Sequence, residues 1–160
     1  MEKFKLNNDN EIYLIDKMHE YLSIFRKLSK YSSEELGNRI GVSRATMVNF
    51  ERNVSKIRMS KAQYIALRTV LEARAEELIQ QDKDDSLKNA IGLVFYNSNY
   101  EENKTKIKEA LTTVGAVCGV AGSISVGTIL APVLGCVALA SLGVGIASYI
   151  LKGLNEKKDN

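Results

Sequence analysis

The chain has 160 residues, enough for one ordinary domain or for a small domain with an appendage, and its formal net charge is only +3. Charged residues are dense as far as Glu109 and are then absent from Ala110 to Leu151, a pattern foreign to a soluble protein surface. The composition therefore excludes one uniform globular chain and divides the protein into two parts of different kinds.

Residues that catalysis or metal binding needs are scarce. Cys118 and Cys136 lie in the uncharged stretch without a histidine or acid nearby, so we interpret them as small apolar residues in a reducing cytoplasm. His19, the only histidine, is interpreted as a surface or half-buried helix residue rather than a base. The chain has no nucleophile motif, phosphate loop or paired metal carboxylates. We expect no enzyme activity, catalytic residue, metal or cofactor.

Apolar residues at helical spacing predict a first helix over residues 11–30. These residues are Ile12, Ile15, Tyr21 or Leu22, Phe25 and Leu28. The preceding residues 1–10 are polar and contain no apolar signal region, so we expect no secretory signal.

Serines predict the starts of three further helices. Ser32 with Glu35 matches a capping box, and a short helix follows as far as Gly41. Ser43 is expected to cap a helix that ends near Arg52.

After a basic loop, Ser60 is expected to cap a longer helix that ends near Gln81. Its apolar positions are Tyr64, Leu67, Leu71, Ala75 and Leu78. The first 80 residues are thus predicted to contain about five helices and no strand.

Positive charge is concentrated in the same part of the chain. Between Arg26 and Arg68 there are ten basic residues and three acidic ones. Such a concentration suits a polyanionic partner, although a solvated helical face has a similar pattern.

Residues 32–53, SSEELGNRIGVSRATMVNFERN, have the pattern of two short helices that cross at a turn. Gly37 lies where the helices meet and only a small side chain fits, and Gly41 lies where the turn needs a left-handed backbone. The apolar residues expected to hold the two helices together are Leu36, Ile40, Val42, Met47 and Phe50. The exposed face of the second helix is expected to carry Arg44, Ala45, Thr46 and Asn49.

This string resembles the helix-turn-helix of the phage-repressor (Cro-type, or XRE) family, and the resemblance covers residues 20–80. It departs from the family pattern at Gly37, where alanine is usual, and at Arg52 or Asn53, where glycine often ends the helix. The resemblance implies a domain over residues 1–83 that binds double-stranded DNA. The residues implied to face base edges are Arg44, Ala45 and Asn49, and those implied to approach phosphates are Ser33, Ser43, Thr46, Arg52 and Lys56.

The chemistry of these side chains agrees with the predicted DNA binding, because arginine can pair with guanine and asparagine with adenine in the major groove. Two alternatives stay open. The first is a compact helical bundle without DNA binding, and the second is a repressor-like fold retained as a protein-interaction module.

Residues 84–108 are predicted to be a linker that contains a short apolar helix over 87–96. The polar string NSNYEEN interrupts it, and KTKIKEA then leads without a break into the uncharged segment.

The uncharged segment is about twice the length of roughly 20 residues that crosses a bilayer as a helix. Pro132 stands near its middle, and lysines on both sides favour two cytoplasmic ends. We predict a two-pass transmembrane hairpin over 109–152 and a charged tail over 153–160, at the cytoplasmic face of a bacterial inner membrane. A re-entrant segment, or a buried hairpin in a soluble cytoplasmic oligomer, is the alternative.

Small residues recur at every fourth position of this segment, as in glycine-zipper membrane helices, which it resembles. They are Gly115, Gly119, Ser123, Gly127, Ala131 and Gly135. Such a ridge allows close helix packing, so we predict a homo-oligomer, a dimer or higher.

The leading hypothesis for function is a membrane-tethered, self-associating transcriptional regulator, such as a repressor, from a bacterium, phage or mobile element. A second hypothesis is a pore-forming effector of a phage-defence or toxin system, in which the helix-turn-helix is a sensor or autoregulator. A third is a soluble regulator whose glycine-rich segment forms the oligomer core.

Overall fold

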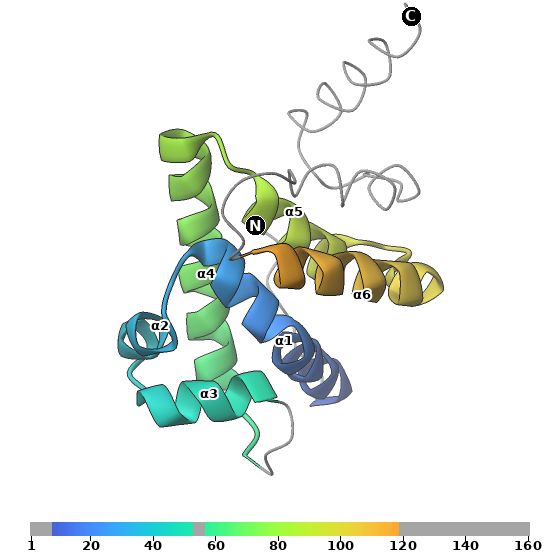
Figure 1. The fold of residues 1–160 in the computed structure, drawn as a ribbon. Helices are drawn as coiled ribbons and strands as arrows, with labels where there is room; N and C mark the ends of the chain where they lie inside the picture. The colour runs from blue at the N-terminus through green and yellow to red at the C-terminus, as the bar shows by residue number, and fades with distance from the viewer. Residues whose placement is uncertain (1–7, 53–56, 119–160) are drawn as a thin grey trace, which may run out of the picture. The chain divides into compact units, whose positions relative to one another are not determined.

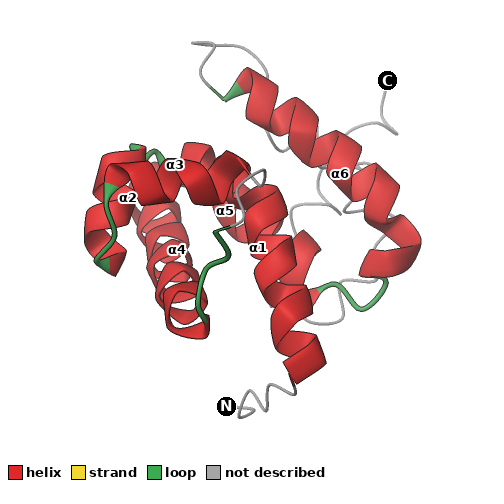
Figure 2. Ribbon diagram, turned by 90° about the horizontal axis from the view of Figure 1, so that it is seen from below, coloured by secondary structure: helices red, strands yellow, loops and turns green. Residues whose placement is uncertain are grey.

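The computed structural model describes residues 8–52 and 57–118, and every regular element in those ranges is a helix (Figure 2). They comprise six α-helices and one π-helical turn. The predicted all-α class is therefore confirmed for this part of the chain. Packing divides the chain into two compact units, residues 1–88 and residues 89–160, whereas the sequence placed the first boundary after residue 83.

Helix α1 (Asn8–Ser29) forms because apolar residues recur along one of its faces. Ile15, Leu22 and Phe25 are buried, as their spacing predicts. Ile12 shares that spacing but is 46% exposed, so the packed face of the helix begins one turn later than predicted.

Helices α2 (Ser33–Ile40) and α3 (Arg44–Arg52) are joined by residues 41–43 and run in different directions (Figure 1). The Ser32 hydroxyl accepts the Glu35 backbone N–H at 3.1 Å, and the Ser32 backbone N–H donates to the Glu35 carboxylate at 2.7 Å. The predicted capping box is thus confirmed. Because the Ser32 N–H stabilises the charged carboxylate, it lowers the pKa of Glu35.

Helix α4 (Lys61–Asp82) begins at the predicted cap. The Ser60 hydroxyl accepts the Gln63 backbone N–H at 3.3 Å, and the Ser60 N–H donates to the Gln63 side chain at 2.8 Å. All of the predicted apolar positions of this helix are buried: Tyr64, Leu67, Leu71, Ala75 and Leu78.

The core of the first unit lies between these four helices, because α1 and α2 each pack against both α3 and α4 (Figure 1). Its enclosed side chains come from all four: Met18, Leu22, Phe25, Leu36, Met47, Phe50, Leu67 and Leu71. Three residues of the set predicted to hold α2 against α3 are buried: Leu36, Met47 and Phe50. Ile40 and Val42 are only half-buried. Helices α2 and α3 are therefore held in place because each of them buries one of its faces in the core.

Helix α5 (Ser86–Ile91) continues directly into the π-helical turn η1 (Gly92–Tyr96), and together they match the predicted short apolar helix. The Asn97 side-chain carbonyl then accepts the Asn99 backbone N–H at 2.9 Å. Helix α6 (Tyr100–Val117) follows, so the break is shorter than the predicted interruption over 97–103. Within the second unit α6 packs against η1.

Helix α6 runs from the charged linker into the uncharged segment without a break, as predicted, and contains the predicted boundary between residues 108 and 109. Gly115, the first position of the predicted zipper, is buried in α6. The remaining positions lie outside the described residues, as does most of the predicted hairpin: Gly119, Ser123, Gly127, Ala131 and Gly135. Among the described helices, none is long and apolar enough to cross a membrane.

Candidate nucleic-acid interface

The turn between α2 and α3 depends on two glycines. Gly41 has a φ of 75°, the left-handed backbone that was predicted for it. Gly37 lies against the turn: the Val42 N–H donates to the Gly37 carbonyl at 2.9 Å, and a Cβ added at Gly37 would lie 2.8 Å from the Val42 carbonyl oxygen. The prediction that only a small side chain fits at Gly37 is confirmed, and even the methyl group of an alanine would lie too close to the turn.

We expect Gly37→Ala to lower the melting temperature even though alanine favours a helix by about 1 kcal/mol. The added methyl group would push the turn away from α2, and overpacking of this kind costs about 1–3 kcal/mol. Thermal unfolding followed by circular dichroism checks this. Gly41→Ala is the matched control. Its added Cβ would meet nothing within 4 Å, so this variant has the strain of a left-handed backbone without the steric clash expected for Gly37→Ala. A melting temperature above that of the wild type for Gly37→Ala would contradict the expectation.

One face of α3 packs into the core through Met47 and Phe50, which are buried. Positions 45, 48, 49 and 52 have the spacing of a single helical face and lie on the opposite side. Two of the predicted base-reading residues, Arg44 and Ala45, are exposed, and the third, Asn49, is half-buried.

Val48 is a half-buried residue of the same outward face that the sequence interpretation missed. The sequence does indicate that Val48 faces outward, because Val48 lies three residues after Ala45 and one before Asn49, both of which were expected on the exposed face.

The residues predicted to contact phosphates have different local roles. The Ser43 hydroxyl accepts the Thr46 backbone N–H at 3.1 Å and hydrogen-bonds to the Thr46 hydroxyl at 2.9 Å, so Ser43 caps α3 as predicted. The Ser33 hydroxyl donates to the Glu51 carboxylate at 3.1 Å. Lys56 lies outside the described residues.

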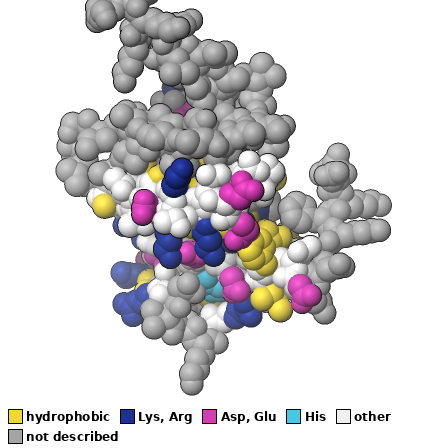
Figure 3. Space-filling view, turned by 90° about the vertical axis from the view of Figure 1, so that its right-hand side faces the viewer, with side chains coloured by type: hydrophobic (Ala, Val, Ile, Leu, Met, Phe, Trp, Pro, Cys, Tyr) yellow, Lys and Arg dark blue, Asp and Glu magenta, His cyan; other side chains and the backbone are white. Residues whose placement is uncertain are grey.

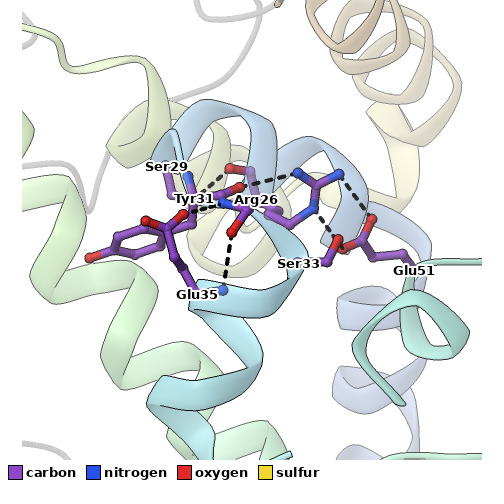
Figure 4. A network of polar contacts seen from close by, with 7 residues as sticks. Arg26, Ser29, Tyr31, Ser33, Glu35 and Glu51 are labelled. Carbon is purple, nitrogen blue, oxygen red and sulfur yellow. Dashed lines mark hydrogen bonds and ion pairs between the residues drawn. The ribbon is translucent and has the colours of Figure 1, made fainter. Parts of the chain in front are cut away.

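An ion pair joins three of the helices around this turn (Figure 4). Arg26 of α1 donates from Nε to Glu51 Oε1 at 2.6 Å and from Nη2 to Oε2 at 3.2 Å, while its Nη1 donates to the Tyr31 carbonyl at 3.1 Å. Ser33, in the first turn of α2, donates to the same carboxylate. The two charged side chains are only 20% and 11% exposed, and such bidentate pairs are strong and directional. The pair therefore sets the direction of α3 relative to α1 and α2.

His19 is more buried than predicted, with 5% of its surface exposed. Its Nε2 accepts the Met59 backbone N–H at 3.1 Å, so the ring proton is on Nδ1 and is donated to the Phe50 carbonyl at 3.0 Å. The ring also contacts the Phe50 ring edge-on, with centroids 5.5 Å apart. The interpretation of His19 as a surface or half-buried residue was wrong. The imidazole is buried because it hydrogen-bonds to a backbone carbonyl of α3 and to a backbone N–H just before α4.

The basic cluster predicted between Arg26 and Arg68 is partly neutralised in the fold. Five of its ten residues form ion pairs with acidic residues: Arg26 with Glu51, Lys30 with Asp82 and Asp84, Arg58 with Asp16, Lys61 with Glu11, and Arg68 with Glu72. Figure 3 shows Lys and Arg side chains next to Asp and Glu side chains on one face of the molecule. Net charge counted along the sequence therefore overstates the positive potential of this surface.

Helix α3 is different from the rest of the cluster. Arg44 in its first turn and Arg52 in its last are exposed, and neither has an acidic partner among residues 8–52 and 57–118. Arg39, at the end of α2, lies over the Tyr31 ring at 4.5 Å and is also exposed. Positive charge without an acidic partner in the described part of the chain is thus found at both ends of α3.

The candidate interface consequently comprises the first turn of α2, the turn at Gly41 and the outward face of α3. The Glu35 N–H is bonded to the Ser32 hydroxyl, and the two preceding N–H groups of α2, those of Ser33 and Glu34, suit a phosphate oxygen. Comparisons of the chain with protein-family models, with characterised proteins and with solved structures gave no match.

Proposed function

We propose that α1 to α4 form a repressor-like domain that binds double-stranded DNA through α3. The observation that carries this proposal is the composition of α3. Its inner face is packed into the core, and its outward face presents Ala45, Val48 and Asn49 between two arginines without acidic partners among the described residues. A rigidly held helix with such a face suits the major groove, which admits an α-helix.

The proposed contacts follow from the chemistry of each position. Arg44 offers two parallel donors to the O6 and N7 atoms of guanine, and Asn49 can pair with adenine. Ser33, Ser43, Thr46 and Arg52 lie in or next to the ends of α2 and α3, where phosphate contacts position a helix-turn-helix on the duplex. Base contacts from Arg44 and Asn49 of α3, combined with phosphate contacts from the other residues, give sequence-specific binding.

The proposed biological role is transcriptional regulation, with two domains close together on a pair of half-sites. Membrane tethering and self-association through the glycine-rich segment belong to this proposal on the grounds of sequence alone. Their support is the uncharged length of 110–151, the central proline and the small residues at every fourth position.

Selection of duplexes from a random pool by the full-length protein tests the proposal. We expect an enriched motif, and we expect its affinity to fall steeply with salt because phosphate contacts release counterions. Lack of any enriched sequence would favour a protein-interaction module or a membrane effector instead.

A further inference from the structure

The outward face of α3 contains a pair of apolar residues, and neither belongs to the buried core. Ala45 is exposed and Val48 is half-buried, and they lie three residues apart on the side opposite Met47 and Phe50. Side chains at this spacing are neighbours on a helix surface. The two form a small apolar area between the charged ends of the helix, which are marked by Arg44 and Arg52.

We infer that Val48, with Ala45, contacts the C5-methyl group of a thymine, so that Val48 is a specificity-determining residue. The inference rests on the proposed DNA binding and adds a base that the polar residues do not read. The thymine methyl is the one apolar group that base pairs present in the major groove, and small apolar side chains contact it there.

The position of Val48 next to Asn49 strengthens this assignment. Asn49 can pair with adenine, and the thymine opposite an adenine presents its methyl group in the same groove. Consecutive bases are about 3.4 Å apart along the duplex axis, whereas consecutive residues such as Val48 and Asn49 are only about 1.5 Å apart along the axis of α3. Val48 and Asn49 therefore reach the same base pair or adjacent pairs, and the expected half-site contains an A·T pair in addition to the guanine read by Arg44.

Deoxyuridine substitution tests the inference, because deoxyuridine lacks only the methyl group of thymine. Full-length protein is titrated with its selected duplex and with duplexes in which each thymine in turn is replaced by deoxyuridine. At one or two positions we expect wild-type affinity to fall about fourfold, the value for one buried methyl group. For Val48→Ala the same replacement should change affinity less than twofold.

Two controls separate this effect from a loss of folding or of binding. Ile65→Ala removes an exposed apolar side chain from α4 and should keep the full sensitivity to deoxyuridine. Circular dichroism should give Val48→Ala the helical spectrum of the wild type and a melting temperature only slightly lower, since Val48 is half-buried and lies outside the enclosed core.

The inference would be overturned by a selected duplex whose affinity is unchanged by deoxyuridine at every position. It would also be overturned by a sensitivity that Val48→Ala leaves intact. Both results keep sequence-specific binding and so differ from failure of the proposed function, in which no sequence is enriched and both proposals fall together.

Discussion

Replacing His19 by alanine is expected to lower the free energy of unfolding by about 3–5 kcal/mol, because two buried backbone groups lose their partner and a cavity is left. The groups are the Phe50 carbonyl, 3.0 Å from Nδ1, and the Met59 N–H, 3.1 Å from Nε2. A buried polar group without a hydrogen bond costs about 1–3 kcal/mol, so two of them account for most of the loss. Urea unfolding followed by circular dichroism measures it.

Two further variants separate hydrogen bonding from packing. His19→Phe fills the space but bonds to neither backbone group, so it should remain well below the wild type in stability. Ser23→Ala changes a half-buried residue of the same helix and should shift stability by less than about 1 kcal/mol. Wild-type stability for His19→Phe would show that the imidazole acts only by filling volume.

Arg44→Ala is expected to weaken binding of the selected duplex by about 5- to 150-fold, which corresponds to the 1–3 kcal/mol of a bidentate contact with guanine. Arg44 is exposed and has no acidic partner among the described residues, so its removal leaves the fold intact. Fluorescence anisotropy with the selected duplex and with a scrambled duplex measures the two affinities. The loss should be confined to the selected duplex.

Arg52→Ala and Lys88→Ala are the matched controls, since each removes one positive charge. Arg52 lies on the same helix and is proposed to contact a phosphate, so its removal should weaken both duplexes alike and reduce the salt dependence. Lys88 is paired with Glu76 at 2.9 Å, far along the chain from α3, and should have little effect. Equal losses on both duplexes for Arg44→Ala would mean that Arg44 contacts a phosphate instead of a base.

The local structure of the first unit could be predicted from the sequence because its signals act over a few residues. Ser32 and Glu35 form their capping box within one turn, as do Ser60 and Gln63. Gly41 takes the left-handed backbone that its turn requires. Helix α4 could be predicted from the periodicity of its apolar residues alone. Apolar residues that recur every three or four positions form one face of a helix, and that face is buried wherever the helix packs.

Tertiary structure alone decided which polar residues serve the fold and which are left for a partner. Arg26 and Glu51 are 25 residues apart, and His19 is 31 and 40 residues from its two backbone partners. No local pattern encodes such pairs, so Arg26 was counted in a basic cluster and His19 was placed nearer the surface. Arginines neutralised by an acidic partner differ from Arg44 and Arg52, which have none in the described part of the chain, and this difference likewise exists only after folding. Residues distant in the chain determine it, because an ion pair or a buried hydrogen bond depends on which helices meet in space.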